Sequence, residues 1–242
     1  TERVAGELRY IAERIEGIPD LRIADSNFGM YRQDMDICRE IAKVQDEFGW
    51  PQYIHVATGK NQKERVLRAA DIVHGAMRLS APVQSMDETV LKNIKRQNIS
   101  AGEAIDVARK GNEVGSNTYS EIILCLPGDT KDAHFKTIKQ MVDAGLNFAR
   151  LFTLMMLPGT ELSSESTRRQ YEMATKYRVL PRCFGSYDFG GTTLHSLETE
   201  EVCVANNTMP FDDYLDCRVM DLFVEVFYND GIFEELLGLM KL

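Results

Sequence analysis

Four polar side chains at fixed spacing are the strongest candidates for chemistry in this sequence. Gln84 and Ser85 follow a short, mostly apolar segment, residues 77–83, and Arg96 comes twelve positions after Gln84. Glu121 lies within a later apolar segment, where an ionised carboxylate requires a partner. An arginine forks onto a carboxylate, and a carboxylate accepts hydrogen bonds from hydroxyl groups. These residues are therefore candidates for a ligand-binding site.

The elements that position these side chains are predicted to be strands and helices in alternation. Apolar runs bounded by Gly and Pro predict strands, and apolar residues three and four positions apart predict helices. The predicted strands cover residues 21–28, 52–58, 77–83, 119–126 and 148–157, and the predicted helices cover residues 2–16, 33–48, 62–71, 87–95, 100–115, 130–144 and 162–176. This alternation predicts βαβ units and a parallel sheet, whose strand carboxyl ends bind ligands.

The alternation stops after residue 177. Residues 179–185 could form another strand, and residues 186–196 are predicted to be a loop rich in Gly and Thr. The segment from 211 to 242 is predicted to form one or two helices on the sheet, broken at residues 229–231. The pattern alone leaves a flavodoxin-like sheet, a Rossmann-like sheet and part of a (β/α) barrel open. No GxGxxG follows a strand and no GxxxxGK[S/T] occurs, which disfavours a nucleotide-binding sheet.

Composition excludes several classes of protein. The chain has 242 residues, of which 44% are hydrophobic and 27% charged, as in an ordinary soluble domain. A net charge of -9 and the lack of a basic patch in the sequence disfavour binding to nucleic acid or an anionic membrane. No apolar run is long enough to cross a bilayer and the first residues do not resemble a signal peptide, so we expect a cytoplasmic protein. Five cysteines without a CxxC or CxxxC pair predict buried free thiols.

Four separated motifs occur in a defined order. They are the strand that ends in Gln84-Ser85, the helix that leads to Arg96, the strand and turn from Glu121 to Thr130, and the turn from Leu157 to Thr160. In order and spacing they resemble the radical S-adenosylmethionine (radical SAM) enzymes, in particular the subgroup that often carries a cobalamin-binding domain. The resemblance covers roughly the first two thirds of the chain.

The resemblance implies roles for the first four candidates. Gln84, Arg96 and Glu121 match family positions that hold S-adenosylmethionine through its methionine part and its ribose, and Ser85 belongs to the same strand-end motif as Gln84. Read alone, Gln84 and Ser85 could satisfy neighbouring backbone groups, and Arg96 could be a solvated cation at a helix end.

The resemblance also implies the fold and three further site residues. It implies a partial (β/α) TIM-like barrel of parallel strands for residues 1–177, with residues 178–242 as a C-terminal helical extension packed on it. Asp25 and Asn27 fall where the family has a short polar motif near the methionine amine, although a turn or a helix cap explains them equally well. Leu157 falls where backbone and apolar groups contact the adenine.

The family's iron-sulfur cofactor has no ligands here. A [4Fe-4S] cluster is held by a CxxxCxxC motif after the first strand of the family, and this sequence contains no such motif. Its first helix resembles the one that follows that loop, so we expect the first strand and the cluster loop to be missing. In the intact protein the resemblance implies the cluster, S-adenosylmethionine cleavage to a 5′-deoxyadenosyl radical or a radical methyl transfer, and a cobalamin domain as a further option. The chain alone is expected neither to hold a cluster nor to cleave S-adenosylmethionine.

Two other functions remain open. The chain could be a non-catalytic radical SAM-like protein or a partner subunit that has lost the cluster, or it could be an unrelated barrel lyase or aldolase with Lys60 as its Schiff-base lysine. The four histidines are isolated and are expected to bind no metal. Arg182, Tyr187 and His195 are polar enough to line a substrate pocket but match no motif. The open sheet edge where the first strand is missing predicts self-association.

Overall fold

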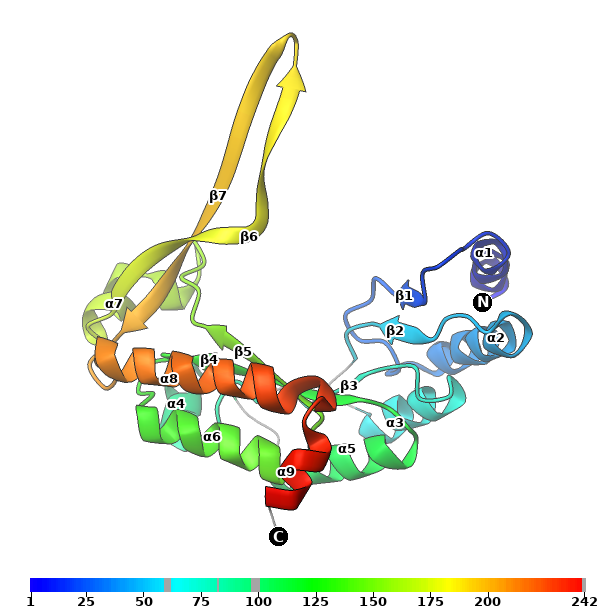
Figure 1. Cartoon of the computed structure of the whole chain (residues 1–242), viewed down its shortest axis with the longest axis horizontal. Coiled ribbons are helices and arrows are strands. Elements are labelled where there is room, and N and C mark those ends of the chain that lie inside the picture. The colour runs from blue at the N-terminus through cyan, green and yellow to red at the C-terminus, as the bar shows by residue number, and fades with distance from the viewer. Residues whose placement is uncertain (59–61, 82, 97–100, 241–242) are drawn as a thin grey trace.

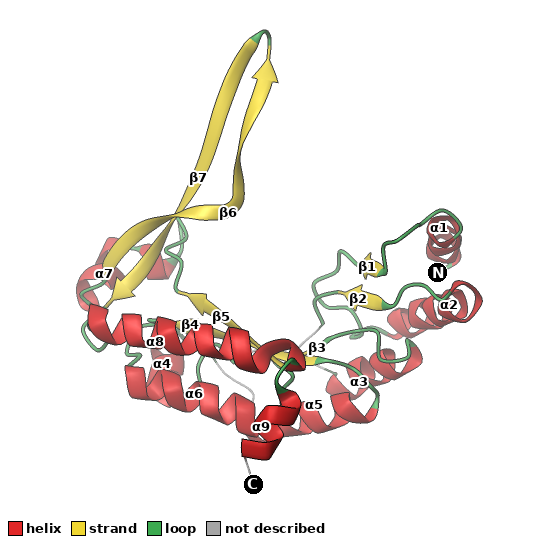
Figure 2. Ribbon diagram, in the orientation of Figure 1, coloured by secondary structure: helices red, strands yellow, loops and turns green. Residues whose placement is uncertain are grey.

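The computed structural model describes residues 1–58, 62–81, 83–96 and 101–240. Strands and helices alternate through its first part, as the sequence predicts (Figures 1 and 2). The strands are β1 (Asp20–Arg22), β2 (Tyr53–His55), β3 (Leu79–Ser80), β4 (Thr118–Leu124) and β5 (Phe148–Thr153). The helices are α1 (Glu2–Ala12), α2 (Arg32–Phe48), α3 (Lys63–Ile72), α4 (Glu88–Asn93), α5 (Ala101–Glu113) and α6 (Lys131–Asp143), followed after β5 by the short helices η1 (Glu161–Ser163) and α7 (Glu165–Gln170).

The five strands form one curved, parallel arrangement. β1 pairs with β2, and β3, β4 and β5 pair in that order, all in parallel. A parallel bridge between Ile54 and Met77 joins the two groups, and the Ile54 N–H donates to the carbonyl of Ala76 at 2.8 Å. The strands follow an arc with helices along its outer side (Figure 1). The predicted fold class, a partial α/β barrel of parallel strands, is therefore confirmed.

The sheet buries one face against the helices. Along β4 the side chains alternate between buried and half-buried positions, with Ile122 and Leu124 buried and Glu121 half-buried. Ile122 packs in a core with Ile138 and Met141 of α6. Burial of each such side chain contributes about 1.5–3 kcal/mol, which fixes the register of β4 and turns Glu121 to the face that the helices do not cover.

One glycine is required where β3 begins. Gly75 has φ +75°, and a Cβ built on it would lie 2.5 Å from the carbonyl oxygen of Val114. Only glycine tolerates both the left-handed backbone and this close approach. The turn after α3 therefore packs directly on the end of α5, which sets the path of the chain into β3.

The region after α7 differs from the prediction. Residues 162–176 were predicted to be helical, but α7 ends at Gln170 and a long hairpin follows, made of β6 (Ala174–Phe189) and β7 (Thr192–Ala205). The predicted loop at residues 186–196 is wrong too, because these residues form the outer half of the hairpin and its tip. Gly190 and Gly191 both have positive φ, which is what a two-residue hairpin turn with the twist of its strands requires. The hairpin extends away from the sheet (Figure 1).

Helices close the chain, as predicted. α8 (Phe211–Phe223) continues into a π-helical turn, η2 (Val224–Tyr228), then into η3 (Asn229–Gly231) and α9 (Glu234–Met240). The side-chain amide of Asn229 accepts from the N–H of Ala149 and donates to its carbonyl, both at 2.9 Å, so it occupies the free edge of β5 as a neighbouring strand would. The buried pair His134 and Asp221, 2.8 Å apart, ties α6 to α8.

Two further predictions concern the whole chain. None of the helices in the described part of the chain has the length and apolar character needed to cross a membrane. The division into two parts at residue 177 stays a prediction.

Candidate functional site

Gln84 lies four residues after the end of β3, in a strained and buried position. Its N–H donates to the carbonyl of Glu121 and its own carbonyl accepts from the N–H of Ile123, both at 2.8 Å. Its φ is +55°, an uncommon value for a residue other than glycine, and only 4% of it is exposed. The side-chain Oε1 is buried without a hydrogen-bond partner in the described structure. An orphaned amide oxygen at a strand end is a ready acceptor for a ligand.

Ser85 has a structural role that its position in the sequence left open. Its hydroxyl oxygen accepts from the N–H of Asp87 at 3.1 Å. Asp87 in turn caps α4, because its carboxylate accepts from the N–H groups of Thr89 and Val90. Ser85 thus supports the start of α4, whereas the Oε1 of Gln84 has no hydrogen-bond partner in the described structure.

Glu121 lies on β4, directly beside the Gln84 backbone. It is half-buried on the sheet face that lacks helices, and its register partner on β5 is Arg150. The Arg150 guanidinium lies over the ring of Tyr119, with its carbon 5.5 Å from the ring centre. No hydrogen bond or ion pair engages the Glu121 carboxylate within the described residues. The carboxylate is therefore free to accept hydrogen bonds from a ligand lying on this face.

The structure does not join the remaining predicted residues to this pair. Arg96 is exposed just after the end of α4, and Leu157 is exposed in a turn that its carbonyl closes by accepting from Thr160. Asp25 accepts from the N–H of Asn27 at 2.7 Å, so these exposed residues form an Asx turn, which was the alternative interpretation.

Residues assigned to other predictions lie away from this pair. Arg182, Tyr187 and His195 are exposed on the hairpin, where His195 pairs with the Ser186 hydroxyl at 2.8 Å. Lys60, the candidate for an aldolase, lies outside the described residues.

Sequence reasoning missed a buried carboxyl beside this region. Asp129 is only 2% exposed, its Oδ2 accepts from the N–H of Cys125 at 3.0 Å, and its Oδ1 has no partner in the described structure. Burial raises the pKa of Asp129 to about 6, against a lowering by His134 and by backbone N–H groups. The helix cap predicted at residue 129 or 130 is Thr130, which accepts from the N–H of Ala133. The sequence feature that could have indicated this buried carboxyl is the acidic residue two positions after Pro127.

The cysteines are free thiols, as predicted, and four of the five are buried. Cys125 and Cys203 lie with their sulfurs 3.7 Å apart, and the hydrogen bond between them and burial raise the pKa of the Cys125 thiol. Among the residues that the structure describes, no group of three or more His, Cys, Asp or Glu side chains could hold a metal ion. The residues present therefore do not fit an iron-sulfur cluster, which needs several thiolates in one place.

Comparisons with known proteins agree with the resemblance. No family model matches the sequence. The chain is 29% identical over 232 residues to the cobalamin-dependent radical SAM methyltransferase TokK of Streptomyces tokunonensis, which covers 94% of this chain and 33% of that protein. It is 28% identical, with the same coverage, to the 2-(S-pantetheinyl)-carbapenam-3-carboxylate methyltransferase of Streptantibioticus cattleyicolor. The chain thus spans about a third of the length of these curated relatives.

Similar solved structures include two radical SAM proteins. The methyltransferase TsrM from Kitasatospora setae, with cobalamin and a [4Fe-4S] cluster bound, has 15% identity and a TM-score of 0.48 over 61% of this chain and 28% of its own. The coproporphyrinogen III oxidase HemN from Escherichia coli has 16% identity and a TM-score of 0.46 over 70% of this chain and 39% of its own. Both relatives are methyltransferases and TokK is a cobalamin-dependent radical SAM enzyme, which confirms the predicted resemblance and a radical SAM core at the level of the family.

Proposed function

We propose that this chain is the S-adenosylmethionine-binding core of a radical SAM methyltransferase. Two observations carry the proposal: the Gln84 amide oxygen is buried without a partner, and the Glu121 carboxylate is unpaired on the strand whose backbone bonds to Gln84. The relatives of the chain include such an enzyme. The intact enzyme would use S-adenosylmethionine as its radical or methyl source, with a cluster and a cobalamin held by residues that this sequence does not contain.

The residues of this chain would hold and orient the cofactor. The Glu121 carboxylate accepts from the two ribose hydroxyls, because it lies on the open face of the sheet with both oxygens available. The Gln84 amide oxygen accepts from a donor on the methionine part, which removes the cost of leaving it buried and unpaired. Arg96, just after α4, pairs with the methionine carboxylate in this proposal. The turn at Leu157 contacts the adenine.

Binding of S-adenosylmethionine to the chain tests the proposal directly. Isothermal titration calorimetry should show binding to the wild type and weaker binding to the Glu121→Gln variant by about tenfold or more, because a hydrogen bond to a charged group contributes about 1.5–3 kcal/mol. Glu113→Gln is the matched control, since Glu113 is exposed on α5 and, among the described residues, pairs with Arg109. A wild type that binds no S-adenosylmethionine, or equal affinities for the three proteins, would refute the proposed site.

The second candidate function is that of a non-catalytic relative or a partner subunit. This sequence contains no CxxxCxxC motif, which fits both this candidate and a radical SAM enzyme of which the chain is one part. Determining the coding DNA that precedes the codon for Thr1 in its source separates the two. A strand followed by CxxxCxxC would support the methyltransferase, whereas a start codon with nothing before it would support the non-catalytic protein. On either reading, the chain alone should stay colourless after anaerobic incubation with iron and sulfide, and a brown, reductively active preparation would contradict this.

A further inference from the structure

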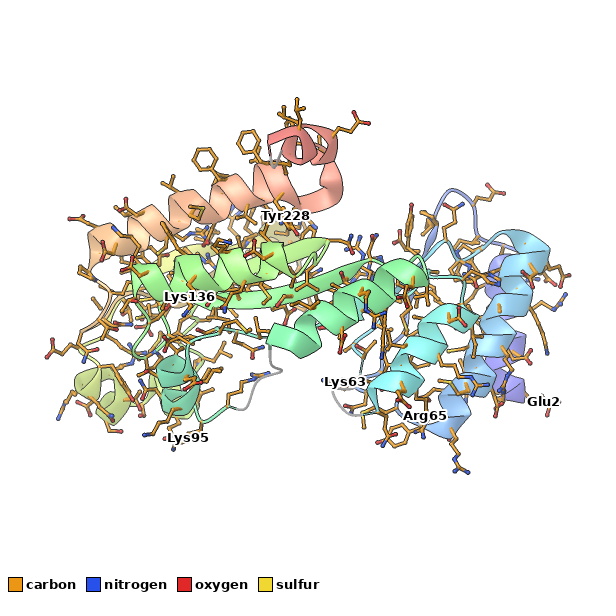
Figure 3. The ribbon with its side chains drawn as sticks, turned by 90° about the horizontal axis from the view of Figure 1, so that it is seen from below. Glu2, Lys63, Arg65, Lys95, Lys136 and Tyr228 are labelled. Atoms are coloured by element: carbon orange, nitrogen blue, oxygen red, sulfur yellow. The ribbon has the colours of Figure 1, made fainter. Side chains whose placement is uncertain are left out.

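A groove rich in arginine lies between the first turns of α2 and α3. It has a volume of about 570 Å³, and its charged lining consists of Arg32, Asp36 and Arg39 from α2 and Glu64, Arg65 and Arg68 from α3. Arg65 lies at the end of α3 that adjoins α2 (Figure 3). The sequence showed no basic patch, because the four arginines come from two helices and approach each other only in the folded chain.

The charges of this arginine groove do not cancel. Asp36 is paired with Arg39, so these two residues neutralise each other. Arg65 donates to the carbonyl of Met30, a neutral group that leaves its positive charge uncompensated. Arg32 and Arg68 form no ion pair within the described part of the chain, and Glu64 is the one remaining acidic side chain of the lining. The groove therefore carries an excess of two positive charges, in a chain with a net charge of -9.

The two helices add to this positive potential. α2 has 17 residues and α3 has 10, and both begin at the groove with the positive ends of their dipoles. The first turn of α2 is already capped, because Asp34 accepts from the N–H of Tyr31 at 2.9 Å. Gln62, the residue immediately before α3, has φ +61° and provides no side-chain cap.

We propose that the arginine groove binds a small ligand that carries a phosphate group. Guanidinium groups recognise phosphate oxygens through paired N–H donors, and three of the four here have no anionic partner. The volume is that of a small-molecule site. An extended polyanion such as nucleic acid is disfavoured, because Asp36 and Glu64 lie in the same groove and the rest of the chain is acidic.

The position of the groove relates its ligand to the proposed reaction. Binding of that ligand does not depend on the proposed reaction. Helices of a βα unit begin where the preceding strands end, so the first turns of α2 and α3 lie at the carboxyl end of the sheet. Gln84 follows β3 on that side, whereas Glu121 lies within β4. The groove is nevertheless formed by other residues, on the helices of the outer wall. A phosphate-bearing ligand held there would lie at the rim of the proposed S-adenosylmethionine site rather than in it.

Titration of the chain with inorganic phosphate and pyrophosphate at low salt tests this inference. The double variant Arg32→Gln/Arg68→Gln should bind pyrophosphate at least about tenfold more weakly than the wild type, because two charge-assisted contacts are lost. The control double variant Arg3→Gln/Arg109→Gln removes the same charge from exposed ion pairs elsewhere and should bind as the wild type does. Circular dichroism checks that both variants are folded.

Three results would overturn the inference. The first is that neither anion binds to the wild type. The second is that both double variants lose the same affinity, which would indicate a response to net charge alone. The third is that poly-glutamate binds, in a manner that requires Arg32 and Arg68, but pyrophosphate does not. The last result would assign the groove to an acidic protein partner. The Glu121→Gln variant should bind pyrophosphate normally, so a failure of the proposed S-adenosylmethionine site is distinguishable from a failure here.

Discussion

Replacing Asp129 with asparagine should change how the stability of the chain depends on pH. The folded state raises the pKa of Asp129 from 3.8 to about 6, chiefly because the carboxyl is buried. Such a carboxyl ionises less readily in the folded chain than in the unfolded chain, so the folded chain loses stability as the pH rises. This destabilisation is absent below pH 3.8, grows as the pH rises and is complete above about pH 6. The side-chain amide of the Asp129→Asn variant does not titrate in this range.

The size of the effect follows from the shift. A shift of about two pKa units, at about 1.4 kcal/mol each, corresponds to about 3 kcal/mol in full, of which about 2 kcal/mol develops between pH 4 and pH 7. The asparagine carbonyl can still accept from the N–H of Cys125, but its amide group would replace the unpartnered Oδ1 and would itself be buried. That cost, about 1–3 kcal/mol, is the same at every pH, so it does not alter the difference between the two pH values.

The assay is urea unfolding of both proteins at half-unit steps from pH 4 to pH 7.5. The free energy of unfolding of the Asp129→Asn variant, minus that of the wild type, should rise by about 2 kcal/mol over this range. Asp143→Asn, at an exposed residue paired with Lys139, is the control and should give a flat difference. Parallel curves for the wild type and the Asp129→Asn variant would refute the reasoning, since they would mean that Asp129 ionises equally easily in the folded and unfolded chains.

Three further predictions follow from particular contacts. Gly75→Ala should lower the free energy of unfolding by about 1–3 kcal/mol in urea, because its Cβ would meet the Val114 carbonyl at φ +75°, and an unchanged midpoint would contradict this. Arg168 and Thr175 lower the pKa of Glu201 from 4.5 to about 2, so the stability that this carboxylate provides is complete above pH 4.5 and is lost as the pH falls toward 2. The stability of the Glu201→Gln variant should therefore depend less on pH in this range, as followed by circular dichroism during acid unfolding. Identical acid-unfolding curves for the variant and the wild type would argue against this. The free edge of β1 (Asp20–Arg22) is proposed to support self-association, so light scattering should show a mass that rises with concentration, and a strict monomer throughout would count against it.

The order of the first elements could be predicted because each carries its own signal. Glycine and proline separate the segments, and α2 buries Cys38, Ile41 and Val44, each three residues after the last. The lengths of the strands could not be predicted as well. Residues 52–58 gave a strand of seven residues, whereas β2 spans only Tyr53–His55, because a strand ends where its neighbour no longer pairs with it. That neighbour is distant in the sequence.

The hairpin shows a local signal that was available but was outweighed. Phe189-Gly-Gly-Thr192 has the two central residues that a tight hairpin requires, yet the surrounding Gly and Thr residues were interpreted as a loop. The helix predicted to end near residue 176 fails for a different reason. Tyr171 follows a short helix, and residues from Ala174 onward pair with β7, so tertiary pairing overrides a weak helical pattern.

The candidate site illustrates why residue types alone could not establish it. Gln84 and Glu121 were selected by their spacing along the chain, but what makes them a unit is the backbone register between them. Ser80 pairs with Tyr119 and Gln84 pairs with Ile122, so four steps on one segment oppose three on the other. One extra residue of this kind bends a strand and redirects the side chains that follow it.

The positive φ of Gln84 follows from the same irregularity. A regular strand would place the Gln84 side chain according to simple alternation, whereas here its oxygen is enclosed and unpaired while its backbone remains bonded to β4. Strain of this type costs about 1–3 kcal/mol and persists only where the surroundings enforce it. The two hydrogen bonds between the Gln84 backbone and β4 provide that enforcement, so the same contacts that stabilise the sheet hold the Gln84 backbone in this conformation. A ligand that donates to Gln84 would therefore bind to an acceptor whose backbone strain is already present in the free protein, so binding would not have to supply that free energy.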